Sequence, residues 1–436
     1  MRIAIVGTGV AGMVTARLLH REHEITIFEA DCRIGGHCNT VPVEVDGETH
    51  NIDTGFIVFN ERTYPHFTQI LSDLDVPTSP TSMSFSVRCD RTGVEYNGTN
   101  LNGLFAQRRN LCRPSFLRML RDILRFNREG AGDAQRVPAD QSVGDYLRDQ
   151  RYSDEFANQY LLPMGAAIWS CPSREFAQFP IRFILEFYAN HGLLSLRDRP
   201  VWRTIEGGSQ AYVSRLVQPF HDRIRIRCPV LTVSRHDHGV IVRHAEGEDT
   251  FDEVVFACHS DQALRILNDA DQLETDILSA FPYNSNTAVL HTDESILPFH
   301  RRAWASWNYH ISKQESSHPT LTYNMNILQH IQSPRTFCVT LNEDASIDPD
   351  TILARFDYAH PLFTTRRSEV QKRHNDVIRH RRTSYCGAYW RNGFHEDGVV
   401  SALAVCKRFG IPGWTSEANR VSTESTMRPV VVSEPA

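Results

Sequence analysis

Three glycines near the start of the chain have the spacing of a turn that holds phosphates. Gly7, Gly9 and Gly12 follow a short apolar strand over 1–6 and open a helix of small and apolar residues over 11–20. The first glycine permits a tight turn, the second lets the backbone approach a pyrophosphate, and the third lets helix and strand pack closely. Unpaired N–H groups and the positive end of the helix dipole attract the phosphates.

An acid at the end of the next strand completes this pattern. The strand over 25–28 ends on Glu29, about 20 residues beyond the glycines, where a dinucleotide-binding unit carries its acidic residue. A carboxylate can accept hydrogen bonds from both hydroxyls of a ribose, whereas it would repel a 2′-phosphate. The spacing therefore predicts a dinucleotide other than NADP.

A second pair of glycines indicates which dinucleotide binds. Gly35 and Gly36 follow Glu29 closely, and an NAD-binding unit has no need of them. FAD continues past its pyrophosphate, so its ribityl chain needs a second close approach to the backbone. The sequence therefore favours FAD.

The motif E-A-x-x-R-x-G-G-x-x-x-T over 29–40 resembles the signature of the large flavoprotein family that includes monoamine oxidases, phytoene desaturases and protoporphyrinogen oxidase. The resemblance implies that Arg33 lies by the pyrophosphate. It also implies that Gly35, Gly36 and the backbone of His37 lie near the ribityl chain and the flavin ring. The family usually has Arg or Lys at the position of His37.

Three later segments resemble other parts of the same FAD site. Residues 51–56, with the pattern D-x-G, are similar to the strand that re-enters beside the flavin. Residues 201–212 resemble a glycine-pair segment that precedes a helix, and 385–402 resemble the C-terminal FAD motif. In that motif a helix, here expected to open at Gly398, directs its N-terminus at the flavin and stabilises the reduced ring.

The resemblance brings residues from both ends of the chain to FAD. Glu396 or Asp397 would cap the C-terminal helix or bind the ribityl chain, and the backbone of Val230 would pair with the adenine edge. Covalent attachment is not expected, because no S-G-G-C-Y motif precedes the C-terminal segment. The residues expected to hold non-covalent FAD are Gly7, Gly9, Val10, Ala11, Gly12, Glu29, Ala30, Arg33, Gly35, Gly36, His37, Thr54, Gly55, Phe56, Val230, Gly387, Glu396, Asp397 and Gly398.

The expected fold is α/β, a Rossmann-like FAD-binding domain of the glutathione-reductase or monoamine-oxidase type with an inserted α+β substrate domain. Alternating valines over 41–45 before the turn at Asp46 predict a hairpin of the FAD-binding domain. From Asn60 the pattern becomes mostly helical, and short strands return near 201. The predicted FAD-binding segments are 1–60, 201–280 and 381–425; the substrate domain takes 61–200 and 281–380, and 426–436 is a tail.

Composition excludes several classes of protein. A net charge of −6 and a pI near 6.4 argue against a nucleic-acid partner. Ten cysteines without metal-ligand spacing indicate reduced thiols and no metal site. A strand that begins at once leaves no room for a signal peptide, and no run of about 18 apolar residues is present. We expect a cytoplasmic protein, with peripheral attachment to the inner membrane surface as an open alternative.

That alternative depends on one basic segment. Residues 107–128 contain seven arginines and one acid. Phe116, Leu120, Ile123 and Leu124 fall at helical spacing, with arginines on the other side of the helix. Such a helix either lies on an anionic membrane surface or is an ordinary amphipathic helix with a solvated basic face.

The resemblance can be narrowed to one branch of the family. The motifs G-G-H-x-N-T, N-I-D-T-G-F-I-V-F-N, W-R-T-I-E-G-G-S, W-A-S-W-N-Y and C-G-A-Y-W-x-x-G-F-H-E-D-G are similar to bacterial amine-oxidase-like proteins and to the flavin domain fused to plant cyclopropane-fatty-acid synthase. That branch implies hydride abstraction from an unsaturated or methyl-branched, lipid-bound acyl chain. An oxidase of a small amine and a non-catalytic flavoprotein partner of a lipid methyltransferase remain alternatives.

No catalytic motif can be carried over from the family. Hydride abstraction mainly requires that a C–H bond be held at the flavin in the absence of water. The candidates near the ring are His37, Asn60, Tyr64, Trp307 and His395. The two histidines could shuttle protons near neutral pH, although a structural role for each is the competing interpretation.

Overall fold

A five-stranded parallel sheet forms the core around the glycine turn. The computed structural model describes residues 1–195, 199–313 and 319–414, so the expected tail over 426–436 and the last part of 381–425 lie outside the described residues. The strand order is β10-β2-β1-β14-β20, and every neighbouring pair is parallel. The strands are β1 (Arg2–Val6), β2 (Glu24–Phe28), β10 (Ile224–Arg225), β14 (Glu253–Phe256) and β20 (Thr383–Tyr385).

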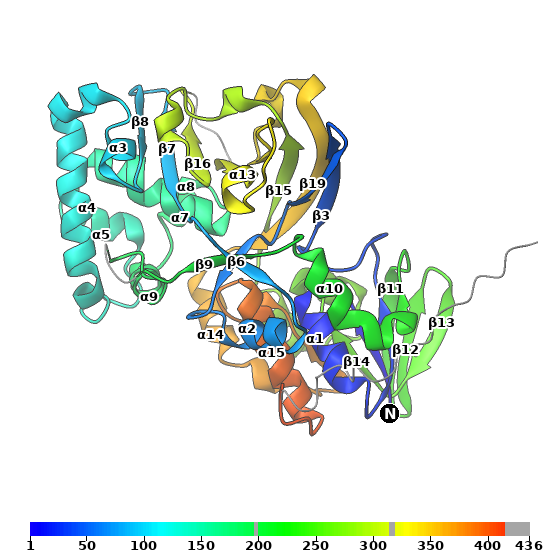
Figure 1. The fold of residues 1–436 in the computed structure, drawn as a ribbon. Helices are drawn as coiled ribbons and strands as arrows, with labels where there is room; N and C mark the ends of the chain where they lie inside the picture. Colours follow the sequence, from blue (N-terminus) through cyan, green and yellow to red (C-terminus); the bar gives the residue numbers. More distant parts are fainter. Residues whose placement is uncertain (196–198, 314–318, 415–436) are drawn as a thin grey trace, which may run out of the picture.

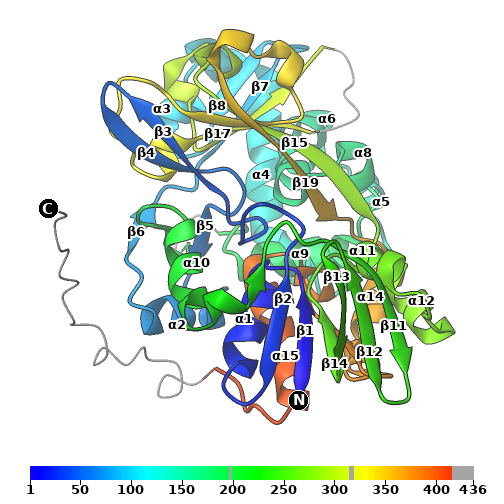
Figure 2. The ribbon, with the colours of Figure 1, turned by 90° about the vertical axis from the view of Figure 1, so that its right-hand side faces the viewer.

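Two helices from opposite ends of the chain cover one face of this sheet. α1 (Val10–Leu19) and α15 (His395–Arg408) pack side by side in one apolar cluster, which includes Ile5 of β1 (Figure 2). Both faces of β1 are buried, which explains its continuous apolar run. Helices α2 (Pro65–Asp73) and α10 (Gln210–Val217) extend the same cluster.

A three-stranded antiparallel sheet and two helices cover the other face. A buried ion pair joins these parts, with Arg235 Nη1 2.6 Å from Glu274 Oε1 and the Tyr385 hydroxyl 2.7 Å from the same oxygen. The elements are β11 (Val230–His236), β12 (Gly239–His244), β13 (Gly247–Phe251), α11 (Ser260–Ile266) and α12 (Gln272–Leu278).

A seven-stranded sheet lies at the opposite end of the molecule from the parallel sheet (Figure 2). Its order is β19-β15-β18-β17-β16-β7-β8, and only the β16–β7 pair is parallel. The sheet therefore combines two stretches far apart in the sequence. Its strands are β7 (Phe85–Cys89), β8 (Val94–Asn97), β15 (Tyr283–His291), β16 (Trp307–Ile311), β17 (Thr320–Asn324), β18 (Cys338–Leu341) and β19 (Ile352–Pro361), with α13 (Met325–Leu328) and α14 (Thr365–Gln371) nearby in the chain.

A helical layer packs against one side of that sheet, and α4 forms its outer edge (Figure 1). Phe116, Met119 and Phe126 of α4 are buried against the protein, whereas Leu124 is 56% exposed. The apolar face of the basic helix is thus used in the core, contrary to a helix that offers that face to a membrane. The layer comprises α3 (Leu101–Leu104), α4 (Pro114–Asp133), α5 (Val143–Asp149), α6 (Asp154–Phe156), α7 (Leu162–Trp169), α8 (Ser173–Phe176) and α9 (Ile181–Asn190). No helix among the described residues is long and apolar enough to cross a membrane.

The hairpin expected in the FAD-binding domain packs elsewhere. β3 (Thr40–Val45) and β4 (Glu48–Asp53) pair only with each other, and their apolar side chains join a cluster with Leu290 and Val339 of the seven-stranded sheet. The alternating valines predict the hairpin but not the surface that it covers. A second small sheet, β5-β9-β6, bridges the two halves; its strands are β5 (Val58–Asn60), β6 (Thr78–Thr81) and β9 (Trp202–Ile205).

A buried histidine in the seven-stranded sheet makes the fold sensitive to acid. His291 is fully buried; its Nδ1 accepts the N–H of Asp293 and its Nε2 lies 2.7 Å from Thr340 Oγ1. Burial lowers the pKa of His291 from 6.5 to about 4. The unfolded state therefore takes up a proton below about pH 6.5 that the folded state refuses, and stability falls as the pH drops from 6.5 toward 4.

We expect the wild-type protein to lose about 1 kcal/mol of unfolding free energy through His291 alone between pH 7.5 and about pH 5.5. In a His291→Gln variant, the slope of unfolding free energy against pH in this window should decrease. The decrease corresponds to at most one proton fewer taken up on unfolding. Urea unfolding at several pH values measures both slopes. An unchanged slope in the variant would show that His291 is not the group responsible.

Candidate functional site

The predicted phosphate turn has an open centre and closely packed flanks. Gly9 is the N-cap of α1, and a Cβ atom added to it would meet no atom within 4 Å. A Cβ on Gly12 would lie 2.1 Å from the carbonyl oxygen of Gly7, and one on Gly36 would lie 3.1 Å from the Gly9 Cα. The first-turn N–H groups of α1 have no intrahelical acceptor. This arrangement suits a pyrophosphate at Gly9.

Glu29 lies beside this turn and beside the segment that leads to β11. Its carboxylate accepts the N–H groups of Thr8 and Asp31, each at 2.9 Å. The Glu29 carbonyl accepts the N–H of Cys228 at 2.8 Å, two residues before Val230, which begins β11. The ribose acid and the expected adenine contact are therefore adjacent.

The second glycine pair forms a loop that Arg33 holds closed. Arg33 Nη1 donates to the carbonyl oxygens of Gly36 at 2.8 Å and Cys38 at 3.3 Å. Gly35 has φ +116°, a left-handed conformation that strains other residues. Arg33 thus shapes the loop in addition to the role by the pyrophosphate that the resemblance implies.

The segment over 54–56 lies directly against that loop. The N–H of Phe56 donates to the His37 carbonyl at 2.8 Å, and a Cβ on Gly55 would lie 2.3 Å from the same oxygen. Thr54 donates its N–H to Asn39 at 2.9 Å. The D-x-G pattern therefore has a physical reason, since two backbones meet at Gly55.

The C-terminal helix begins earlier than the sequence suggests. α15 starts at His395, and Gly398 is its fourth residue rather than its first. The carboxylate of Asp397 accepts the N–H groups of Phe394 at 2.9 Å and Asn392 at 3.1 Å, which caps the helix. A Cβ on Gly398 would lie 2.6 Å from Val10 Cγ1, so this glycine allows α15 to contact the start of α1.

Both acids of this segment accept hydrogen bonds from the protein. The carboxylate of Glu396 accepts the N–H groups of His66 at 3.1 Å and Phe67 at 2.9 Å, so it caps α2. Burial raises the pKa of Glu396 and raises that of Asp397 to about 6. Nearby, the N–H of Gly387 donates to Ser401 Oγ at 2.9 Å. The acids and this glycine order the segment through contacts within the protein.

His395 is a neutral group in a buried cluster. Its Nε2 lies 2.5 Å from the Tyr212 hydroxyl and 3.5 Å from Cys38 Sγ, and its ring stacks on Phe56 with centroids 3.8 Å apart. Burial lowers the pKa of His395 to about 3 and raises that of Cys38 to about 12. At neutral pH the His395 imidazole is therefore uncharged, and it shares a hydrogen bond with the Tyr212 hydroxyl.

His37 lies among histidines that sequence reasoning did not single out. Its ring centroid is 5.0 Å from Tyr358, 5.3 Å from His360 and 6.4 Å from His259. Burial lowers the pKa of His37 well below 6.5 and that of His360 to about 4. His259 lies just after β14, at the carboxyl end of a parallel strand. Ligands often bind at this end of such a sheet, and this position is the feature of the sequence that could have identified His259.

The Nε2 atom of His37 is buried and has no hydrogen-bond partner within the protein. A buried nitrogen without a partner is costly, and a ligand group would satisfy it. With the open position at Gly9, it shows that the described residues fit FAD. Gly9, Glu29, Gly36 and His37 are the residues that would hold it.

The other candidates occupy two places. Asn60 accepts the N–H of Thr63 at 2.9 Å and is fully buried in a turn, which is a structural role. Tyr64 is buried between Phe59 and Trp202, and Asp397 and Glu396 help to raise its pKa. Both lie on the side of α2 and α15, near His395. Trp307 is instead in β16, 5.1 Å from Tyr323, with its Nε1 buried and unpaired.

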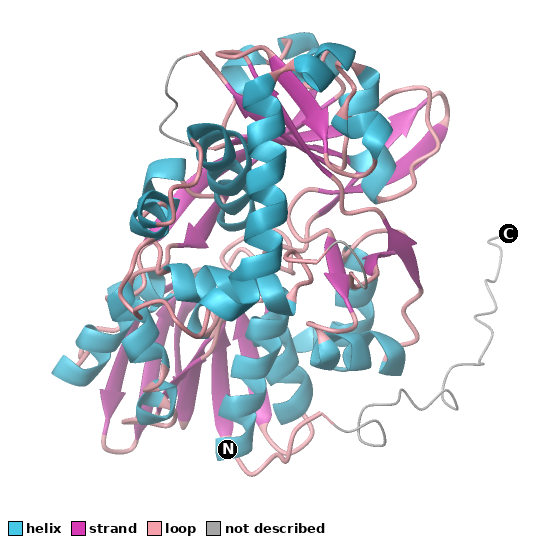
Figure 3. Cartoon of the chain, turned by 90° about the vertical axis from the view of Figure 1, so that its left-hand side faces the viewer, coloured by secondary structure: helices cyan, strands magenta, loops and turns pink. Residues whose placement is uncertain are grey.

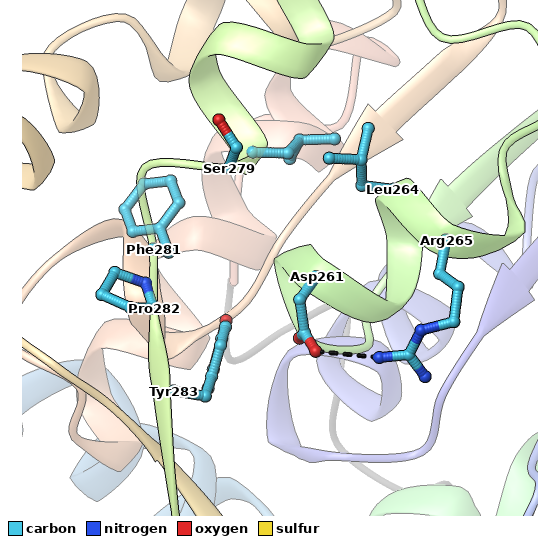
Figure 4. Close-up of a pocket in the computed structure, with 8 residues that line it drawn as sticks. Asp261, Leu264, Arg265, Ser279, Phe281, Pro282 and Tyr283 are labelled. Carbon is cyan, nitrogen blue, oxygen red and sulfur yellow. Dashed lines mark hydrogen bonds and ion pairs between the residues drawn. The ribbon is translucent and has the colours of Figure 1, made fainter.

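A surface pocket of about 450 Å³ lies away from these groups. Leu264, Phe281 and Tyr283 form its apolar part, and an Asp261–Arg265 ion pair of 3.1 Å lies at its side (Figure 4). One of its lining residues, Tyr283, stacks on His259 with ring centroids 4.4 Å apart. Gly9, Glu29, Gly36 and His37 are not among the residues that line the pocket, so it is not the proposed cofactor site.

Two glycine substitutions should separate cofactor binding from folding. Gly9 has φ −62° and free space around it, so Gly9→Ala should fold normally but lose FAD affinity about tenfold or more, because the methyl group occupies the pyrophosphate position. Gly12→Ala pushes α1 away from β1 and should lower stability by roughly 2–3 kcal/mol, several degrees in Tm. FAD titration and thermal melts of the apoproteins measure both effects. Wild-type FAD affinity in Gly9→Ala would place the pyrophosphate elsewhere.

Comparison with known proteins agrees with a flavin cofactor. Residues 10–332 match the family model of flavin containing amine oxidoreductases. A zeta-carotene desaturase of Synechocystis sp. is 45% identical over 60 residues, which cover 14% of this chain and only 12% of the desaturase.

Solved structures share the fold over almost the whole chain. Cyclohexylamine oxidase from Brevibacterium oxydans has a TM-score of 0.64 at 14% identity, covering 94% of this chain and 99% of the oxidase. A fatty acid isomerase from P. acnes, described as CLA-producing, has a TM-score of 0.66 at 14% identity, covering 94% and 98%. The predicted α/β fold and the FAD cofactor are confirmed. The chain belongs to the flavin-containing amine oxidoreductase family of FAD-dependent oxidoreductases.

Proposed function

We propose that this FAD-dependent oxidoreductase desaturates an apolar substrate, an unsaturated or methyl-branched acyl chain. One carbon of the chain would give a hydride to FAD and its neighbour would release a proton to solvent, so that a new double bond forms between them. The observation that carries the proposal is an aromatic cluster where the helical layer meets the start of α15. Phe394 lies 5.3 Å from Phe187 and 6.0 Å from His191, and Phe183 lies 5.0 Å from Phe363.

The cluster is aromatic, and a buried cation lies against it. The Arg367 guanidinium is 3.6 Å from the centre of the Phe363 ring. Phe394 and Phe183 are only half-buried, so they have surface left for a ligand, and the ring centroid of Trp169 is 4.8 Å from that of Phe187.

These charges and rings favour an apolar ligand. Burial lowers the pKa of His191 to about 4, so this imidazole is neutral at pH 7. An aromatic wall beside a cation suits a hydrocarbon chain better than an ammonium group, which requires acids or a cage around it and which Arg367 would repel.

The comparisons fit an apolar substrate, but they fit an amine substrate as well. One relative is named for a carotene and one solved structure for a fatty acid, both of them apolar chains. A cyclohexylamine oxidase is equally similar in structure. Structural similarity at 14% identity shows the fold only, so an apolar substrate is inferred from the residues of this chain.

The side chains of the protein mainly position the substrate and exclude water. When bound, FAD supplies a hydride acceptor in its flavin ring. Phe394 and Phe187 would hold the substrate chain and keep water away from the reacting C–H bond. His395 and Tyr212 fix the start of α15 through their 2.5 Å hydrogen bond, and neither is placed to take up a proton at neutral pH.

Anaerobic mixing of the FAD-loaded protein with candidate substrates tests the proposal. Phospholipid with unsaturated acyl chains should bleach the flavin absorbance and yield an acyl product whose double bonds have changed, detected by mass spectrometry. Phe183→Ser should lower kcat/KM for the acyl chain about tenfold, through loss of aromatic contact. Phe299→Ser, at an exposed phenylalanine outside the cluster, is the control.

Two outcomes would overturn this proposal. Bleaching by small amines, with hydrogen peroxide produced in air, would establish an amine oxidase. Bleaching by no lipid, alone or together with a lipid methyltransferase, would indicate a flavoprotein partner without turnover.

FAD is expected to be bound without a covalent link. Covalent attachment through a cysteine needs a thiolate, and burial raises the pKa of Cys38 to about 12 although the Tyr212 hydroxyl, 2.9 Å away, acts to lower it. Cys38 therefore stays protonated. Precipitation of the protein with acid should release all of the yellow colour into the supernatant. Flavin that remains with the washed pellet would contradict this expectation.

A further inference from the structure

Large apolar side chains are exposed along one edge of the helical layer. Ten such side chains are exposed among the residues that the structure describes, and four of them lie between 101 and 124. They are Leu101 at 75%, Leu111 at 52%, Leu117 at 44% and Leu124 at 56%. Single exposed leucines need no explanation, but four within one short segment indicate an interaction surface.

Arginines of the same segment differ in how far their charge is compensated. Arg118 forms an ion pair with Glu155, and Arg125 and Arg128 share Glu129. These three cations, on the middle and later turns of α4, are therefore largely neutralised.

Three other arginines of the segment have weaker compensation: Arg108 and Arg109, which precede α4, and Arg121, which follows Arg118 within it. Arg108 donates to the Phe105 carbonyl at 2.8 Å and to the amide oxygen of Asn102 at 2.5 Å, and Arg109 donates to the Gly93 carbonyl at 2.8 Å. Arg121 is 75% exposed, and its nearest carboxylate, Asp122, is 3.6 Å away. The less compensated cations thus gather where Leu111 and Leu117 are exposed.

These residues belong to one corner of the molecule. The bonds from Arg108 to Asn102 and Phe105 tie the short helix over 108–112 to α3, and α4 follows directly at Pro114. α4 runs along the outside of the molecule, facing the viewer in Figure 3. We call Leu101, Leu111, Leu117, Arg108, Arg109 and Arg121 the Leu–Arg surface.

We propose that the Leu–Arg surface docks the protein on an anionic lipid bilayer. Leucines that alternate with arginines can enter the acyl boundary while the guanidinium groups stay with the headgroups. The chain as a whole carries a net charge of −6, so its overall field opposes such binding and this local cluster must supply the attraction. An acidic protein partner is the competing occupant.

The bilayer is favoured over an acidic protein by the pattern of the surface. Three exposed leucines are spread over three successive elements with cations between them. No acid among the described residues forms an ion pair with Arg108 or Arg109, and Arg121 has a long ion pair of 3.6 Å with Asp122. A fluid layer of headgroups has no fixed shape, so it can bind such a dispersed pattern. A folded protein partner would need a surface of complementary shape.

Co-flotation of the FAD-loaded protein with vesicles tests the proposal. We expect binding to phosphatidylcholine vesicles that contain phosphatidylglycerol, little binding to phosphatidylcholine alone, and loss of binding at high salt. No binding to the anionic vesicles would overturn the proposal and leave the surface to an acidic protein. The vesicles should carry saturated, unbranched acyl chains, which the proposed reaction does not use, so that vesicle binding can succeed or fail separately from the proposed chemistry.

Matched variants locate the binding surface. Arg121→Glu and Leu117→Ser should each weaken vesicle binding roughly tenfold. The controls are Arg243→Glu, 64% exposed on β12, and Leu353→Ser, which has the same 44% exposure as Leu117 but lies on β19. Thermal melts confirm that each variant folds. Equal losses in the test and control variants would overturn the assignment of this surface.

Discussion

Close contact between backbones at the start of α1 is the constraint on which the rest of the structure depends. Gly12 brings the helix onto the Gly7 carbonyl, Gly36 brings the second loop onto Gly9, and Gly398 brings α15 onto Val10. A Cβ atom on any of these three glycines would lie closer to its neighbour than an ordinary van der Waals contact. Two of the glycines are near the beginning of the chain, and the third is near residue 400. The cofactor site is therefore a gap between backbones, and its polar groups are mostly N–H groups rather than side chains.

The electrostatics of the site follow from this packing. His37 occupies the position where the family usually has a cation, and burial keeps its imidazole neutral, as it does for His360 and His395. The acids Glu396 and Asp397 are committed to capping α2 and α15. With neutral imidazoles and acids already engaged, positive potential for the phosphates would come from the start of α1 and from the Arg33 guanidinium in the second glycine loop.

Local patterns predicted the elements well, because each depends on nearby residues. The glycine turn, Glu29, the hairpin over 40–53 and most strands could be identified from spacing alone. The sequence did not indicate partners far away in the chain: Glu396 caps a helix about 330 residues earlier. The hairpin packs on the second sheet, and His259 and His360 meet His37 through tertiary packing, which no periodicity encodes. Gly398 was taken as a helix start because its real constraint, contact with Val10, cannot be seen locally.

The helical layer contributes both to the aromatic cluster proposed to hold the substrate and to the Leu–Arg surface proposed to bind a membrane. Its outer helix, α4, carries the Leu–Arg surface, and its inner side packs on α9, since a Cβ on Gly130 would lie 3.2 Å from Leu185. The same α9 presents Phe183 and Phe187 toward Phe363 and Phe394 at the start of α15. The contact between Gly130 and α9 is near the end of α4, whereas Leu117 of the Leu–Arg surface lies about 20 Å earlier along the same helix. A lipid chain from a docked bilayer would therefore have to pass along α4 to reach the aromatic cluster, so the docking surface and the aromatic cluster are two separate features of the helical layer.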